Sequence, residues 1–355
     1  MTWQELWGKV LGFPTGTPEF ILAAAVLLMI FVLCVFPAAA FLSLVDRKLS
    51  ADVQARVGPN RAGRWGVFQP LADLMKLLQK EPARAAGWRE GFWLGVLTVC
   101  LYSTAAALPL GSSLILVNTG SSPLLVFWVI TALSVCLMFL GYNQNSVPGW
   151  FSGTRLAAQS LSGAFPALLS VLCVGLWAGG FEWTRIAAAQ GADPAHWAIV
   201  RDPFLLLAFA VFMAGGLVVL SVPPLGSGFS LSDIKGGVAS GFHGRKIAFF
   251  HLGRFYGLFL WSVIAVVCFC GAWNLPTSLS QAVENSDYGI LGVKMIEPLV
   301  TIVKAAFLML FTMLFARVMP ALRSDQVTDF AWKVLSPIAL VALLGTGLWT
   351  LWGGA

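Results

Sequence analysis

The chain has 355 residues, of which 58% are hydrophobic and 11% are charged, and its formal net charge is +6. About a quarter of the residues of a soluble domain are charged, so this composition excludes an ordinary soluble protein and indicates a polytopic membrane protein. The basic residues are gathered neither on one soluble face nor in a tail, which argues against a nucleic-acid-binding protein.

Eight apolar segments have roughly the length that a membrane-spanning helix requires. In chain order they cover residues 19–45, 91–109, 123–142, 156–178, 203–222, 247–273, 298–318 and 334–352. The predicted fold class is therefore all-α, a single integral membrane domain over residues 1–355 with about eight transmembrane helices. The first segment is too long for a cleavable signal peptide, so we expect the mature protein to keep it.

Basic residues are concentrated in alternate connections between these segments, and most of them lie in residues 46–90. By the positive-inside rule, the loops 46–90, 223–246 and 319–333 are expected on the cytoplasmic side of a bacterial inner membrane. Both termini are then periplasmic. The six cysteines all lie inside predicted spans without the clustered spacing of a metal site, so we expect them to be packing residues.

The first cytoplasmic loop is the richest in polar residues and turn signals. The tripeptide Gly58-Pro59-Asn60 predicts a turn. After Pro70, apolar residues recur at helical spacing, which predicts a short amphipathic helix along the membrane surface. These residues are Leu71, Leu74, Met75 and Leu78.

The mixture of charges in this loop separates two interpretations. A loop that only fixes orientation and touches anionic lipid needs positive charge alone. This one also carries acidic residues, among them Asp46, Asp52, Asp73 and Glu81, together with Gln54 and Asn60. Mixed-sign polar groups favour a docking face for another protein or the lining of a polar cavity.

Three stretches of the chain resemble one family. The first contains Asp46, Arg47-Lys48, Gln54, Arg56, Gly58-Pro59-Asn60, Gly63, Gly66, Gln69, Ala72-Asp73, Lys76-Leu77 and Lys80-Glu81. The second contains Lys304-Ala305-Ala306-Phe307-Leu308, Arg317, Pro320, Arg323, Asp325-Gln326, Trp332-Lys333 and Pro337. The third contains Asn145-Ser146 and Arg155-Leu156-Ala157-Ala158-Gln159. Together they resemble the family of H subunits of the proton-pumping NADH:quinone oxidoreductase, respiratory complex I.

The resemblance implies an eight-helix membrane subunit of an oxidoreductase that joins the hydrophilic arm to the membrane arm and forms much of the quinone passage. The chain itself has no dinucleotide fingerprint, iron–sulfur cysteine set or flavin motif, so the electrons must come from partners. Expected partners are the iron–sulfur and quinone-site hydrophilic subunits, small membrane subunits, lipid and quinone as substrate. FMN and iron–sulfur clusters are expected only in those partner subunits.

The resemblance also indicates which residues serve the passage, although none of them is expected to be catalytic and no metal site is expected. The residues expected at the quinone passage or its mouth are Arg47, Gln54, Arg56, Phe229 and Arg323. Those expected in a polar network or at a docking face are Asp46, Asn60, Asp73, Lys76, Glu81 and Asp233.

This chain departs from its family by lacking several glutamates. Gln159 is followed by Ser160 to Ala164 without an acidic residue, the loop 223–235 keeps only Asp233, and Arg254 stands where a glutamate is common. None of the 16 acidic residues lies at the centre of a predicted span. An intramembrane proton path relies on buried ionisable groups. Either the path is lost, which we favour, or waters, hydroxyls, Arg254 and Lys304 replace it.

Two residue pairs inside the spans also leave alternatives open. His251 and Arg254 could face a polar cavity together, or be a satisfied histidine beside a snorkelling arginine. Lys304 either snorkels to the interface or has a partner in the bundle, for which Glu297 is the nearest candidate along the sequence.

Other classes of function remain as alternatives. The missing glutamates fit a membrane anchor subunit of a related hydrogenase or of a paralogous oxidoreductase without proton translocation. A standalone transporter would show internal repeats with broken helices at the bilayer midplane, and no convincing repeat is visible.

Overall fold

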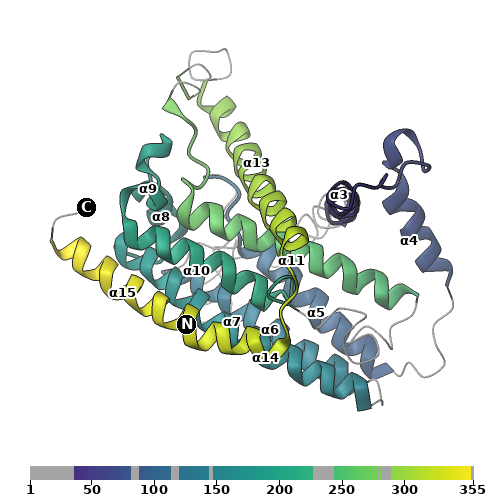
Figure 1. Cartoon of the computed structure of the whole chain (residues 1–355). Coiled ribbons are helices and arrows are strands. Elements are labelled where there is room, and N and C mark those ends of the chain that lie inside the picture. The colour runs from purple at the N-terminus through teal and green to yellow at the C-terminus, as the bar shows by residue number, and fades with distance from the viewer. Residues whose placement is uncertain are drawn as a thin grey trace, which may run out of the picture.

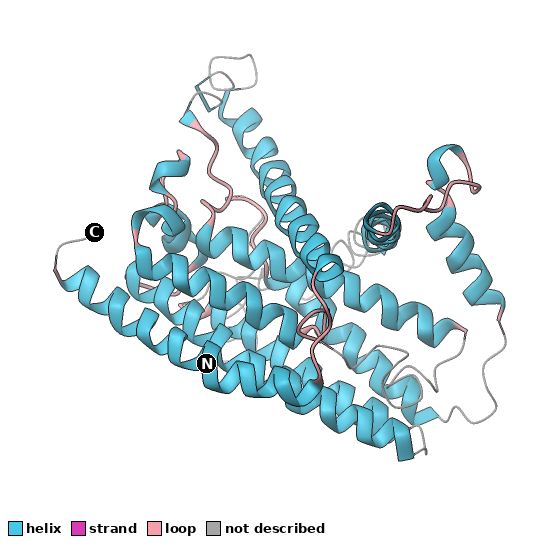
Figure 2. Cartoon of the chain, viewed as in Figure 1, coloured by secondary structure: helices cyan, strands magenta, loops and turns pink. Residues whose placement is uncertain are grey.

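The structure is a computed structural model, and it describes residues 36–80, 88–112, 120–143, 147–226, 244–277, 280–281 and 289–352. Within these ranges the chain forms helices and connecting turns, and Ser121 and Phe181 make an isolated β-bridge. Figure 2 shows this helical character. The all-α fold class predicted from the apolar segments is confirmed for the described part of the chain.

The labelled elements follow one another along the chain as α3 Phe36–Val53, η2 Arg64–Gly66, α4 Gln69–Gln79, α5 Trp88–Ala107, α6 Ser122–Tyr142, α7 Val147–Trp177, α8 Trp183–Ala189, η3 Pro194–His196, α9 Ala198–Arg201, α10 Pro203–Val219, α11 Arg245–Phe269, α13 Gly289–Val318, α14 Ser324–Phe330, the π-helical turn η5 Ala331–Leu335, and α15 Ser336–Leu351.

Helix α7 is the centre of the bundle and packs against α6, α10 and α15 (Figure 1). It carries many small residues, which let neighbouring backbones approach closely. At Gly163 the approach is so close that a Cβ atom would lie 2.6 Å from the side chain of Val218 on α10. Helix α10 in turn contacts α11, where the rings of Phe212 and Trp261 stack with centroids 4.5 Å apart.

Within the residues that the structure describes, four helical segments are long and apolar enough to cross a membrane. They are Val147–Trp177, Lys246–Phe269, Ile296–Val318 and the continuous stretch Ser324–Leu351. Helices α13 and α15 turn large apolar side chains outward, such as Phe307 at 70% and Leu344 at 69% exposure. Such faces are suited to lipid or to other membrane subunits, so the described helices support a membrane protein.

Helices α3 and α4 lie to one side of the main bundle, at the right of Figure 1. Helix α3 contacts α11 and α13, and α4 contacts α3 and α11. The helix α3 continues to Val53, well past residue 45 where the first apolar segment was expected to end. Leu44 and Ala51, seven residues apart, are both buried, so the packed face of the helix extends beyond the apolar run. Asp46 and Arg47 are therefore held on a helix.

Candidate functional site

A cavity of about 280 Å³ lies between α3, α4 and α11. Helix α3 contributes Ala40, Ser43, Asp46 and Arg47; α4 contributes Pro70, Asp73, Leu74 and Leu77; α11 contributes Ala248, His251, Arg254 and Phe255. The cavity thus combines apolar walls with charged and hydrogen-bonding groups. Concave sites of this mixed kind are typical of places where proteins bind small molecules.

Helix α4 forms one wall and carries Pro70 in its first turn, where proline is well suited. A helix lies where the apolar spacing predicted one, but its apolar residues point in two directions. Leu74 and Leu77 are half-buried and line the cavity. Leu71 and Met75 are 57% and 53% exposed on the outer side. Leu71 and Met75 thus leave apolar surface on the outward side of the helix.

The turn before α4 fixes where this wall begins. Gly66 has φ +75°, and a Cβ atom there would lie 2.2 Å from the carbonyl oxygen of Pro59. Only glycine allows this contact, so the predicted turn at Pro59 packs directly on the short helix η2. Lys48 of α3 donates to the Trp65 carbonyl oxygen at 2.6 Å. The turn is therefore tied to α3.

Two ion pairs hold the helices around the cavity. Arg47 on α3 pairs with Asp73 on α4, and Asp73 also accepts a hydrogen bond of 3.0 Å from Gln69. Asp46 on α3 accepts two hydrogen bonds from Arg317 of α13, the Nε bond being 3.2 Å long. Paired hydrogen bonds between arginine and a carboxylate fix orientation as well as distance. Asp46 and Asp73 thus join α3 to α13 and α4.

The cavity brings together some of the residues predicted for the passage and its network. Asp46, Arg47 and Asp73 line it, and His251 and Arg254 line it from α11. Gln54, Arg56 and Asn60 lie on the exposed turn after α3, and Lys76 is exposed on α4. Three further candidates, Glu81, Phe229 and Asp233, lie outside the described residues, as do Asn145 and Ser146 of the family motif.

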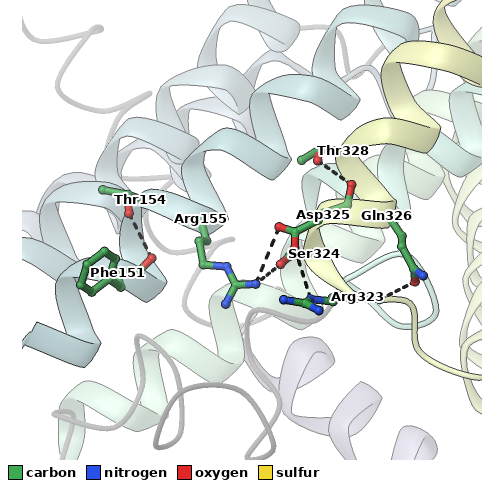
Figure 3. A network of polar contacts seen from close by, with 8 residues as sticks. All are labelled: Phe151, Thr154, Arg155, Arg323, Ser324, Asp325, Gln326 and Thr328. Atoms are coloured by element: carbon green, nitrogen blue, oxygen red, sulfur yellow. Dashed lines mark hydrogen bonds and ion pairs between the residues drawn. The ribbon is translucent and has the colours of Figure 1, made fainter.

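Arg323 belongs to a second polar cluster, where α14 begins beside α7 (Figure 3). Its Nε atom lies 3.2 Å from the Asp325 carboxylate, and its backbone N–H donates to Gln326 at 3.2 Å. Arg155 of α7 donates to the Ser324 hydroxyl and lies 4.0 Å from Asp325. The side chains of Arg323 and Asp325 are 76% and 70% exposed, so this cluster offers charges to the surface.

Sequence reasoning did not identify Arg317 as a partner of Asp46, because the two are 271 residues apart. It also named Glu297 as the nearest candidate partner for Lys304 along the sequence, without expecting direct contact, and the structure gives the two side chains different partners. Glu297 accepts a hydrogen bond of 2.7 Å from the Ser112 backbone N–H, while Lys304 donates to backbone carbonyl groups after α11, including Cys270 at 3.1 Å.

No part of the chain that the structure describes groups three or more His, Cys, Asp or Glu side chains in a way that could hold a metal ion.

Comparison with known proteins adds independent evidence. The sequence model of a family described as NADH dehydrogenase matches residues 25–347. A curated relative, the H subunit of the NADH-quinone oxidoreductase of Chlorobium luteolum, is 29% identical over 98% of this chain and 94% of its own length. Both findings confirm the resemblance that the sequence motifs indicated. The chain belongs to the NADH dehydrogenase family.

Proposed function

We propose that this chain is the membrane subunit of an NADH–quinone oxidoreductase and that the cavity between α3, α4 and α11 is part of its quinone passage. Family membership supports the first half of the proposal. The composition of the cavity supports the second half and is the observation that carries it.

A quinone has a polar head with two carbonyl oxygens and an apolar isoprenoid tail, so its site needs hydrogen-bond donors beside apolar walls. Arg47, His251 and Arg254 bring donor groups to the cavity. Leu74 and Phe255 supply apolar surface. The head group would lie near the charged residues and the tail along the apolar ones.

The chain serves this reaction by binding and positioning. Reduction of a quinone to a quinol takes two electrons and two protons, and the electrons would come from iron–sulfur clusters and FMN of partner subunits. The exposed charges of Arg323, Asp325 and Lys76 would meet hydrophilic partners on the cytoplasmic side. The apolar outer faces of α13 and α15 would meet lipid and small membrane subunits.

The proposed topology has about eight spans in a bacterial inner membrane, with both termini in the periplasm. Asp46 and Arg323, which take part in the polar contacts described above, lie in connections that the positive-inside rule assigns to the cytoplasm. Gln54, Arg56, Asn60, Glu81, Phe229 and Asp233 would complete the mouth of the passage and its polar network on this side.

A weakened role in proton coupling is part of the proposal. Among the described residues, the fully or nearly fully buried carboxylates are Asp202, at the N-cap of α10, and Glu297, at the beginning of the candidate span Ile296–Val318. Both lie at helix or span ends, so neither offers a carboxylate at mid-membrane depth.

The cavity assignment is tested by filling the cavity from one wall. Leu74→Trp places an indole ring in the cavity, whereas Met75→Trp places the same ring on the exposed outer side of the same helix. Overfilling a packed site costs about 1–3 kcal/mol, so we expect Leu74→Trp to raise KM for quinone roughly 5- to 150-fold. Met75→Trp should leave KM near its original value. Equal KM values in the two assembled variants would contradict the assignment.

A further inference from the structure

Lys304, in the middle of α13, has its ammonium group at the C-terminal end of α11. Nζ donates to three backbone carbonyl oxygens: Cys270 at 3.1 Å, Ala272 at 3.1 Å and Asn274 at 3.4 Å. It also lies 4.8 Å from the centroid of the Trp197 ring. An ammonium group has three hydrogens, so three carbonyl groups match its donors. The ring face adds a favourable cation–π contact.

The turn after α11 creates this arrangement of carbonyl groups. Gly271 and Ala272 both have positive φ, +75° and +41°, and alternate carbonyl oxygens converge on one point. A Cβ atom at Gly271 would lie 2.3 Å from Nε1 of Trp197, so the tight turn depends on glycine. The last carbonyl groups of a helix lack intrahelical partners and carry partial negative charge. A half-buried cation is therefore well placed here.

Gln190 completes the same helix end from another side. Its Nε2 atom donates to the carbonyl oxygens of Val267 at 2.9 Å and Cys268 at 3.1 Å. Its Oε1 atom accepts from the Gly271 N–H at 2.6 Å. The side chain is 2% exposed. Gln190 and Lys304 thus bind the end of α11 from two different parts of the chain.

This geometry suits a charged lysine and does not suit one that releases its proton. A neutral amine has two hydrogens, so deprotonation would leave one of the three carbonyl oxygens without its donor. A buried polar group without a hydrogen-bond partner is costly. We propose that Lys304 is a charged positioning residue that fixes the end of α11, and not a proton carrier that replaces the family's missing glutamates.

The position of α11 matters because its other end forms a wall of the cavity through His251 and Arg254. One continuous helix runs from Arg245 to Phe269. At 1.5 Å per residue, Arg254 and Cys270 are about 24 Å apart along the axis. Releasing the end of α11 would therefore displace cavity residues far from Lys304. The expected effect on quinone binding rests on the proposed function. The positioning of α11 by Lys304 does not.

The test uses the assembled oxidoreductase in native membranes, with three variants. Lys304→Met removes the charge and all three donors. Lys304→Arg keeps a cation with several donors that does not lose its proton. Lys294→Met is the control, because Lys294 is exposed on the same helix. The readouts are the thermal unfolding midpoint of the purified assembly, KM for a short-chain quinone, and protons moved per electron.

We expect Lys304→Met to lower the unfolding midpoint and raise KM, and Lys294→Met to change neither. The unfolding midpoint of Lys304→Arg should lie close to that of the unchanged protein. The number of protons that it moves per electron should also be unchanged. A lowered midpoint with an unchanged KM would count against the cavity as the quinone site while leaving the role of Lys304 intact. An unchanged midpoint in Lys304→Met would overturn the positioning role.

The proton-carrier alternative gives a different result. An assembled Lys304→Arg variant that reduces quinone but moves fewer protons would show that Lys304 must release its proton, which contradicts our inference. If Lys304→Arg fails to assemble, Gln190→Leu provides the second test. Because both side chains hold one helix end, the midpoint shifts of Gln190→Leu and Lys304→Met should be less than additive when combined. Full additivity would contradict a shared role.

Discussion

The ion pair between Asp46 and Arg317 joins α3 to the end of α13, and breaking it should loosen one wall of the cavity. Hydrogen bonds to charged groups contribute about 1.5–3 kcal/mol each when well formed, and exposure to solvent reduces this value. Here the Asp46 side chain is 15% exposed and that of Arg317 is 37% exposed. We therefore expect a total contribution of about 1–2 kcal/mol, a factor of roughly 5 to 30 in the equilibrium between docked and loosened α3.

The variants Asp46→Asn and Arg317→Gln, alone and together, test this estimate. Hydrogen exchange of the α3 amide groups measures how often the helix opens. Each single variant should speed exchange by the expected factor, and the double variant should add little because the interaction is already lost. Asp52→Asn is the matched control, since Asp52 is an exposed carboxylate near the end of the same helix.

Two results would refute the reasoning. Strictly additive effects of the two variants would show that the side chains act independently. Equal acceleration by Asp52→Asn would show that loss of any carboxylate on α3 is sufficient, so that the contact with Arg317 is not the cause.

Three further variants have defined outcomes. Arg56→Ala should impair quinone reduction in an assembled complex, and unchanged reductase activity would count against a place for Arg56 at the mouth of the passage. Asp233→Asn should leave both quinone reduction and protons moved per electron nearly unchanged, whereas a collapse in coupling would mean that the proton path has been kept. Gly66→Ala should destabilise the turn on Pro59 by about 1–3 kcal/mol, because φ is +75° and the space is occupied. Gly95→Ala, with nothing within 4 Å of the added Cβ, is its control in a thermal unfolding assay.

Several of the long helices after residue 88 follow the apolar pattern closely. The segment predicted at 123–142 is the helix Ser122–Tyr142, and the segment predicted at 298–318 ends with α13 at Val318. Long apolar runs bounded by proline, glycine or charged residues carry a strong local signal. Helix α13 begins earlier, at Gly289, because a helix can continue beyond the apolar thickness of a membrane.

The contacts that organise the site could not be predicted in the same way. The sequence indicated that Asp46, Arg47 and Asp73 belong to one polar region, since they share the first charged loop. It gave no sign that Arg317 reaches Asp46, because this contact depends on how α13 packs. The partners of Lys304 are backbone carbonyl oxygens, which every residue possesses, so no side-chain pattern marks them.

The most direct test of the proposed passage is photolabelling of the native complex with a photoreactive quinone, followed by identification of the labelled peptides. The cavity predicts label on residues 40–47 of α3, 70–77 of α4 and 248–255 of α11, with excess unlabelled quinone preventing it. Labelling that is blocked by quinone but confined to other parts of the chain, or to other subunits, would contradict a quinone passage between these three helices.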